Sequence, residues 1–279
     1  MAELNKTNKI RVATFNIGDY STANGSSGDG IPLGNGTEVT KEEYVALFKK
    51  VNADLWGLQE DSEFFNGTTK ETAYDAIYKK VLPFYKRNFA WTYNGKAFLS
   101  NKELFDVEPV KYPPAVTSYA PDGTNGYGHG WFLKGKIRVD GKDISIVSLH
   151  FDWNCKERRA VQIESVIEFA KSQKYCIIIG DFNPEDYVNG TKLESGRINE
   201  GSINVYQEDW KKFSDAGFEH ANGGKFGAFA TLMKKGQARD PHPWDNIVVT
   251  PNITITDAKV VVEPWMDDHA IIVAELEIN

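Results

Sequence analysis

The sequence predicts an α+β fold in which mixed β-sheets carry helices on their outer faces. Three observations support this prediction. Segments with strand character outnumber segments with helical spacing. The dipeptide Asp140-Gly141 is a strong hairpin signal between two of the strands. Helical segments separate other strands, so hairpins and helical crossovers occur in the same chain. The chain of 279 residues has no internal repeat and no long linker, and we expect a single domain over residues 1–279.

The expected strands are short, apolar and rich in β-branched residues. In chain order they are Ile10–Asn16, Asp54–Gln59, Trp131–Val139, Lys142–Leu149, Cys176–Ile179, Asn246–Thr250, Ile253–Val262 and Ala270–Leu276. The turn at Asp140-Gly141 makes the third and fourth of them an antiparallel pair.

Three segments have the apolar spacing of a helix. The first follows a capping-box pattern at 40–43. The apolar faces are Tyr44, Leu47, Phe48 and Val51, then Tyr74, Ile77, Tyr78 and Val81, and finally Ile163, Val166, Ile167 and Ala170. Residues 18–39 and 121–130 are rich in Gly, Ser and Asn. We expect them to be long loops that flank the mouth of a site and set its substrate.

Charge, cysteine content and apolar stretches narrow the class of protein. The net charge of −7 argues against a sequence-reading DNA-binding module, because such modules carry a basic face. It does not exclude an enzyme that contacts nucleic acid through a local patch and metal ions. Cys155 and Cys176 have no zinc-type spacing and are too few for a disulfide framework, so we expect two free thiols. The sequence shows no signal peptide and no transmembrane stretch. We expect a cytoplasmic protein, or a secreted one if an export signal has been removed.

Polar side chains recur at the ends of the expected strands. They are Asn16, Glu60, His150, Asp181, Asn183, Asp245, Asp267, Asp268 and His269. Each alone is an ordinary turn residue, but these side chains converge if neighbouring strands share an end. Carboxylate and carboxamide oxygens are hard ligands that suit Mg²⁺, Mn²⁺ or Ca²⁺. Two imidazoles and a spare carboxylate can add acid–base chemistry, a combination suited to hydrolysis of a phosphate ester.

In chain order these motifs resemble the endonuclease/exonuclease/phosphatase superfamily, which has the DNase I-like fold. The matching segments are TFNIG (14–18), LQE (58–60), SLHFD (148–152), IIGDFN (178–183), WDNIVV (244–249) and DDHAIIVAEL (267–276). GDFN and DDHA are the most specific of them. The resemblance implies a four-layer αββα sandwich, with two mixed β-sheets packed face to face and helices outside. It also implies a Mg²⁺-dependent hydrolase that acts on phosphoric ester bonds.

The resemblance further implies roles for the residues that match the motifs. Glu60 is expected to be the principal metal ligand, with Asn16 helping to form the metal site and Asp268 beside it. His269 is expected to contact the scissile phosphate as a general acid–base or charge-stabilising group. Asp245 is expected to hydrogen-bond to His269 and so to fix its tautomer.

Three further residues complete the implied catalytic set. Asp181 is expected to orient or deprotonate the attacking water, and Asn183 to hold a phosphate oxygen or the nucleophile. His150 is expected to bind the phosphate from the other side. Asp267 is expected to be a turn residue. The remaining histidines match no motif and are expected in exposed or loop positions: His129, His220 and His242.

Aromatic side chains lie beside these motifs in the sequence. Trp153 and Trp244 are expected to bind substrate, although burial in the core would also account for them. The same two interpretations hold for Trp131. Arg158 and Arg159 follow the strand that ends at His150. One of them could reach a phosphate, and the alternatives are solvation at the surface or an ion pair on a helix.

The substrate class is less closely defined than the chemistry. The acidic balance disfavours tight, nonspecific duplex binding, because phosphate contacts need Lys and Arg. We favour an endonuclease-type phosphodiesterase with nucleic acid as its partner, since WDNIVV and DDHAII are more similar to DNase motifs than to those of inositol phosphatases. The alternatives are a sphingomyelinase-like phospholipid phosphodiesterase and a small-molecule phosphomonoesterase. An inactive binding scaffold is the alternative from another class.

Overall fold

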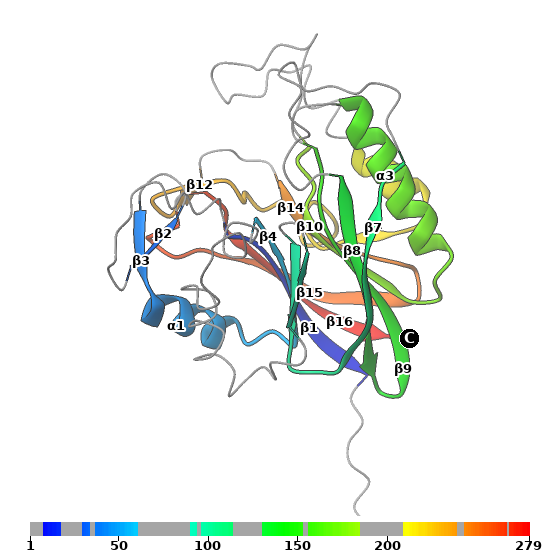
Figure 1. Ribbon diagram of the computed structural model, residues 1–279, viewed down its shortest axis with the longest axis horizontal. Coiled ribbons are helices and arrows are strands. Elements are labelled where there is room, and N and C mark those ends of the chain that lie inside the picture. Colours follow the sequence, from blue (N-terminus) through cyan, green and yellow to red (C-terminus); the bar gives the residue numbers. More distant parts are fainter. Residues whose placement is uncertain are drawn as a thin grey trace, which may run out of the picture.

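The structure is a computed structural model that describes residues 8–17, 30–33, 37–60, 90–93, 96–113, 130–152, 156–184, 209–238, 243–266 and 268–279. Within these ranges the chain forms two six-stranded mixed β-sheets that pack face to face, with helices on their outer sides (Figure 1). This arrangement confirms the predicted αββα sandwich. None of the helices in the described ranges has both the length and the apolar character that crossing a membrane requires.

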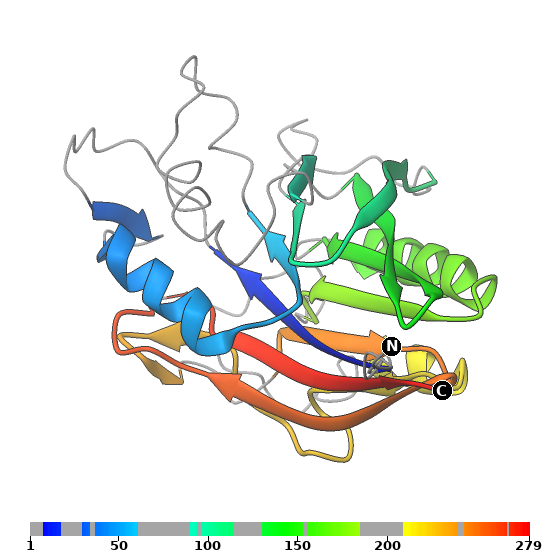
Figure 2. The ribbon, with the colours of Figure 1, turned by 90° about the horizontal axis from the view of Figure 1, so that it is seen from below.

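The first sheet contains the strands nearest to the two ends of the described chain. Its order is β15 (Ile253–Val261), β16 (Ile271–Ile278), β1 (Lys9–Asn16), β4 (Leu55–Gln59), β6 (Lys96–Ser100) and β5 (Ala90–Tyr93). Figure 2 shows β1, β16 and β15 side by side in blue, red and orange. The pair β1–β4 is parallel and the other pairs are antiparallel, so β1 and β4 end at the same edge of the sheet.

The second sheet is built around one parallel pair. Its order is β11 (Glu219–His220), β14 (Asp245–Val249), β10 (Cys176–Asp181), β9 (Lys142–His150), β8 (Trp131–Val139) and β7 (Leu104–Lys111). Strands β9 and β10 run parallel, and every other pair is antiparallel. Two small hairpins, β2 (Gly30–Leu33) with β3 (Thr37–Thr40) and β12 (Met233–Lys234) with β13 (Gln237–Ala238), stand apart from both sheets.

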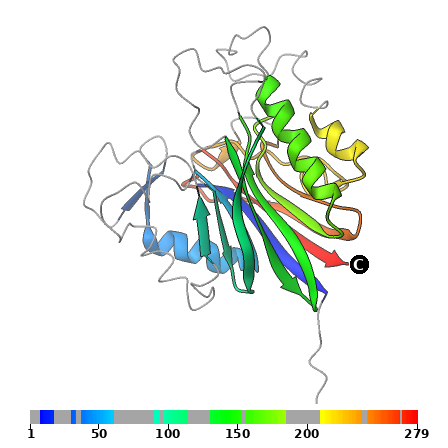
Figure 3. The ribbon, with the colours of Figure 1, turned by 45° about the vertical axis from the view of Figure 1, so that its right-hand side comes forward.

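Alternating side chains divide the core into an inner layer and two outer layers. The inner layer between the sheets includes Val12, Leu55, Ile146, Ile179 and Ile247, all fully buried. Outside the first sheet, α1 (Lys41–Val51) packs Leu47, Phe48 and Val51 into one cluster with Trp56. Outside the second sheet, α3 (Lys156–Lys171) contributes Ile163, Val166 and Ala170 to another cluster. The two helices thus cover opposite faces of the sandwich (Figure 3).

A glycine allows the two sheets to approach closely near one edge. Gly57 on β4 faces Ile179 on β10, and a Cβ atom at Gly57 would lie 2.6 Å from Ile179 Cγ2. Real side chains do not pack at such a distance, so any larger residue at this position would push β4 and β10 apart. The edge that this contact holds together is the one where β1, β4, β9 and β10 end.

Several predicted elements differ from the observed ones. The expected loop at 18–39 contains the hairpin of β2 and β3, whose Ile31, Leu33 and Val39 have strand propensity. Strands β5, β6 and β7 were not predicted. Charged residues and Pro109 interrupt the apolar pattern of β7, whereas β5 and β6 are short, with four and five residues. The expected helix at 74–81 and most of the expected loop at 121–130 lie outside the described residues. All the predicted strands and two of the predicted helices are confirmed, with shifts of one or two residues at some strand ends.

Candidate active site

Three neighbouring strands of the second sheet bring polar residues together at one edge. His150 is the last residue of β9, Asp181 is the last of β10, and Asp245 is the first of β14. Asp181 is in register with His150 on one side and with Asp245 on the other. Side chains two positions apart on a strand point to the same face of the sheet. Ile179 and Ile247 lie in the inner layer, and Ser148 contacts Leu58 of the opposite sheet. The side chains of all three polar residues therefore point between the sheets.

The first sheet supplies Asn16 and Glu60 from the facing edge. Asn16 is the last residue of β1, and Glu60 directly follows β4. The amide nitrogen of Asn16 donates to Glu60 Oε1 at 3.0 Å and to Asp181 Oδ2 at 3.0 Å. Strict alternation from Leu58, which lies in the outer layer, would direct Glu60 outward. The left-handed backbone of Glu60, with φ of 58°, brings its carboxylate back to the site.

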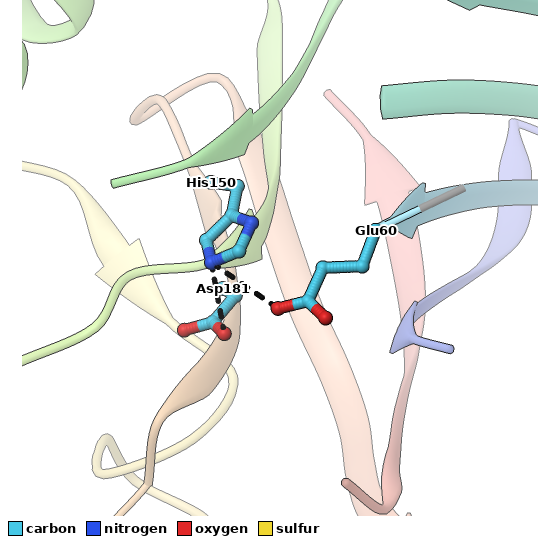
Figure 4. A group of neighbouring side chains, drawn as sticks. All are labelled: Glu60, His150 and Asp181. Carbon is cyan, nitrogen blue, oxygen red and sulfur yellow. Dashed lines mark ion pairs between the residues drawn. The ribbon is translucent and has the colours of Figure 1, made fainter. Parts of the chain in front are cut away.

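His150 stands between the two carboxylates. Its Nε2 atom lies 3.7 Å from Glu60 Oε1 and 3.6 Å from Asp181 Oδ2 (Figure 4). The imidazole is buried, with 7% of its residue surface exposed. Each of the three residues therefore presents one polar atom to a common point between the sheets.

His269 approaches Asp181 from the other side. Its Nδ1 atom lies 2.7 Å from Asp245 Oδ2, and its Nε2 atom lies 3.7 Å from Asp181 Oδ2. Burial alone lowers the pKa of His269, but the carboxylates of Asp245, Asp268 and Asp181 outweigh burial and hold that pKa well above its ordinary value. This raised pKa favours the charged form of the ring, in which Nδ1–H donates to Asp245 Oδ2.

Asp181 is the centre of the cluster and is almost fully buried. Burial and the nearby carboxylate of Asp245 raise the pKa of Asp181 to about 8, against the opposing effects of His269 and Asn16. The Oδ1 atom of Asp181 accepts from the backbone N–H of Asn183 at 2.9 Å. Asn183 has a left-handed backbone, with φ of 41°, and its side-chain amide donates to the carbonyl of Phe151. This turn joins the ends of β9 and β10.

The donor set of this cluster fits a divalent cation. Among the described residues, two groups hold acidic or imidazole atoms within 4.8 Å of one another: Glu60, His150 and Asp181, and Asp181, Asp245 and His269. Asp245 Oδ1 is buried and has no hydrogen-bond partner in the described part of the chain, so it is a spare oxygen ligand. Asp268 belongs to neither group, although its Oδ1 atom lies 3.9 Å from His269 Nε2.

Thr231 is a positioning residue that no sequence motif predicted. Its hydroxyl accepts from the backbone N–H groups of Trp244 at 2.9 Å and Asp245 at 3.1 Å. Its carbonyl accepts from the N–H of Ala270, next to His269, at 2.8 Å. One fully buried threonine therefore joins the segments that carry Asp245 and His269. Nothing in the local sequence FATLM distinguishes this residue from an ordinary strand threonine.

The remaining candidates fall in different places. Trp244 is buried, and Trp153 and Asp267 lie outside the described residues. Arg159 forms a buried ion pair with Asp209 at 2.9 Å, and Arg158 contacts Asp152 at 2.7 Å, so the ion-pair interpretation holds for both. The expectation that His220 is exposed or in a loop was wrong. His220 lies on β11, buried against the rings of Trp210 and Phe213. Cys176 is a buried free thiol, as expected.

The structure is similar to several solved structures of other proteins. The structure of an endonuclease/exonuclease/phosphatase from Beutenbergia cavernae is 15% identical and has a TM-score of 0.66, with 97% of this chain and 72% of that chain covered. The human Nocturnin catalytic domain with bound sulfate anion is 15% identical with a TM-score of 0.61, covering 98% and 96% of the two chains. The Bacteroides thetaiotaomicron mannosyl-6-phosphatase Bt3783 is 14% identical with a TM-score of 0.59, covering 96% and 99%. At these identities the likeness shows a shared fold.

A comparison with the curated proteins gave no match. The family model described as Endonuclease/Exonuclease/phosphatase family matches residues 14–265, which include every candidate site residue named above except Asp267, Asp268 and His269. Because this match covers most of the chain, and because the fold and the motif order agree with it, the chain belongs to the endonuclease/exonuclease/phosphatase family.

Proposed function

We propose that this protein is a divalent-metal-dependent phosphodiesterase that cleaves nucleic acid as an endonuclease-type enzyme. The observation that carries the proposal is the double hydrogen bond of Asn16 to Glu60 and Asp181. It holds two carboxylates from facing sheets beside two buried histidines, so that charged groups gather between the sheets where water is largely excluded. Such an arrangement costs stability unless it binds something, since like charges brought together out of water repel one another.

Each side chain has a distinct task in this proposal. Glu60 and Asn16 hold the cation, preferably Mg²⁺, which supplies charge neutralisation at the phosphate oxygens and favours ionised carboxylates around it. Asp181 orients the attacking water and accepts its proton. The imidazolium of His269 binds a phosphate oxygen through Nε2, while Asp245 holds Nδ1. His150 and Asn183 bind the phosphate from the side of β9.

Family membership supports the phosphoester chemistry, and the motifs WDNIVV and DDHAII support a nuclease in particular. The chain is acidic overall, so its binding to nucleic acid must depend on the cation and on local basic residues.

The experiment has two parts. Hydrolysis of bis-p-nitrophenyl phosphate is measured with Mg²⁺ or Mn²⁺, with EDTA, and for His269→Ala against the exposed control Asp257→Asn. We expect activity that EDTA and His269→Ala abolish and that the control retains. Full activity in EDTA would contradict a metal-dependent mechanism.

A substrate panel of plasmid DNA, RNA, sphingomyelin and sugar phosphates then assigns the substrate class. Cleavage of DNA or RNA supports the nuclease assignment. Turnover of phosphomonoesters or sphingomyelin alone would replace it with one of the other two activities. A chain that turned over nothing in the presence of either metal would be a binding scaffold.

A further inference from the structure

One row of side chains crosses five neighbouring strands of the second sheet at the active-site edge. In order it contains Lys111 on β7, Trp131 on β8, His150 on β9, Asp181 on β10 and Asp245 on β14. Lys111 pairs with Trp131, and Asp181 pairs with both His150 and Asp245. The pairing of Leu133 with Ser148 places Trp131 opposite His150, two residues further along the same antiparallel ladder. Three members of this row belong to the candidate active site, and two have no role so far.

Trp131 and Lys111 share the face of the sheet that carries the active site. Alternation puts Trp131 on the side of Leu133 and Ile137, which lie in the inner layer between the sheets. Trp131 is half-buried and Lys111 is exposed, whereas His150 beside them is buried. The Lys111 ammonium lies 5.6 Å from the centre of the Trp131 ring. The row therefore opens from the buried reaction centre towards solvent through an aromatic ring and then a cation.

The charges on β7 and β8 single out Lys111. Further along these strands, Lys134 pairs with Glu108 at 2.8 Å and Lys136 with Asp106 at 2.9 Å. Within the described ranges, Lys111 has no carboxylate partner. Among the described lysines of β7 and β8, Lys111 at the active-site end is thus the one for which no ion pair with a described residue offsets the charge, in a chain that is acidic overall.

The distance between neighbouring strands determines which part of a bound substrate can reach Trp131 and Lys111. Strands lie about 4.8 Å apart, so Trp131 stands about 5 Å and Lys111 about 10 Å from the backbone position of His150. A substituent on a phosphate at His150 therefore meets the indole first and the ammonium next. The side chain of a lysine is flexible. The Lys111 ammonium can therefore move from the Trp131 ring to a nearby phosphate oxygen while the lysine backbone stays in place.

We propose that Trp131 and Lys111 form a nucleotide subsite beside the reaction centre. Trp131 stacks against the base attached to the scissile phosphate, and Lys111 pairs with the next phosphate along the strand. This assignment rests on the proposed phosphodiesterase function and adds to it the location of the recognised base. It also predicts a preference for unpaired strands, because a base in a duplex is already stacked on its neighbours.

The test compares a dinucleotide phosphodiester with a dinucleotide of the same backbone that lacks bases. For Trp131→Ala we expect kcat/KM to fall about 10- to 100-fold on the dinucleotide and to change little on the base-free substrate. Trp131→Phe keeps an aromatic face and should recover most of the loss, and it also controls for folding. Equal losses on both substrates, or no loss on either, would overturn the stacking role.

The cation is tested by salt dependence on a trinucleotide. Lys111→Ala should reduce the slope of log(kcat/KM) against log[salt] by about 1, while the ion-paired control Lys136→Ala should leave it unchanged. Equal slopes for Lys111→Ala and the wild-type protein would remove Lys111 from the subsite.

Failure of the proposed function is distinguishable from failure of the subsite. If the wild-type protein hydrolyses neither dinucleotide, the proposed phosphodiesterase function is wrong. The subsite is then tested by calorimetry, which compares the binding of thymidine monophosphate with that of ribose phosphate. A preference for the nucleotide that Trp131→Ala abolishes supports the subsite. Equal binding of both ligands by the wild-type protein overturns it.

Discussion

The Nδ1 atom of His269 lies 2.7 Å from the Oδ2 atom of Asp245, and both side chains are buried. Asp245 starts a strand of the second sheet, and His269 precedes a strand of the first, so this contact joins the two sheets. It leaves Nε2 of His269 directed towards Asp181 at 3.7 Å. The carboxylate therefore both orients the ring and stabilises its positive charge.

Replacement of Asp245 by asparagine should remove the charge that supports His269 in catalysis, while the side chain at position 245 keeps nearly the same shape. We expect Asp245→Asn to lower kcat by about 100- to 10,000-fold with little change in KM, because the charge that stabilises the imidazolium is lost. The double variant with His269→Ala should be little worse than either single variant, since the two residues act as one unit. Additive losses in steady-state kinetics would show that they act independently.

Removal of the Glu60 carboxylate should abolish metal binding. A ligand that binds only the folded protein raises its unfolding temperature, so Mg²⁺ or Mn²⁺ should stabilise the wild-type protein. The stabilisation should be lost in Glu60→Gln and kept in Glu168→Gln, which changes an exposed glutamate on α3. Thermal unfolding with and without the cation measures this, and an unchanged shift in Glu60→Gln would place the metal elsewhere.

Thr231 should matter through its hydroxyl rather than its methyl group. Thr231→Val leaves the buried N–H groups of Trp244 and Asp245 without their acceptor, so we expect a loss of about 1–3 kcal/mol in unfolding free energy and a lower kcat. Thr231→Ser retains the acceptor and should recover kcat. Urea unfolding combined with kinetics tests both parts. If the serine variant were as inactive as the valine variant, the positioning role would be wrong.

Gly57 should tolerate no side chain. A Cβ atom there would lie 2.6 Å from Ile179 Cγ2, so Gly57→Ala should lower the unfolding free energy by about 1–3 kcal/mol. It should also lower activity, because separating β4 from β10 pulls Glu60 away from Asp181. Gly130→Ala is the matched control, since a Cβ atom at Gly130 meets nothing within 4 Å. In combination with Ile179→Ala the cost of Gly57→Ala should shrink, and additive costs would contradict the contact.

His220 should make the protein acid-sensitive. Burial lowers the pKa of His220 from 6.5 to about 4. The unfolded chain therefore takes up a proton as the pH falls below about 6.5 while the folded chain does not, so folding stability is lost between about pH 6.5 and pH 4. The loss approaches about 3 kcal/mol at the acid end of this range. Urea unfolding at pH 7 and pH 4.5 should show a smaller pH dependence for His220→Gln, and an equal one would exclude His220 as the cause.

Local patterns predicted the central strands well and the peripheral ones poorly. Strand β10 begins with the unbroken apolar run Cys176–Ile179, which needs no partner to be identified as a strand. Strand β7 contains Glu108 and Pro109 and has half-exposed positions along its length, so only its pairing with β8 makes it a strand. His220 looks like a loop histidine in the sequence, and it becomes a core residue because the rings of Trp210 and Phe213 pack around it.

The sequence by itself determined the chemical inventory of this protein: carboxylates, carboxamides and imidazoles that follow apolar strands in the order typical of one family. Which of them meet was decided by the tertiary structure. Asn16 and Asp181 are 165 positions apart and lie on different sheets, yet their side chains bond at 3.0 Å. No local pattern encodes that contact. It exists because parallel strands in each sheet end at one edge, and because Gly57 leaves room for Ile179 so that the two edges can close on each other.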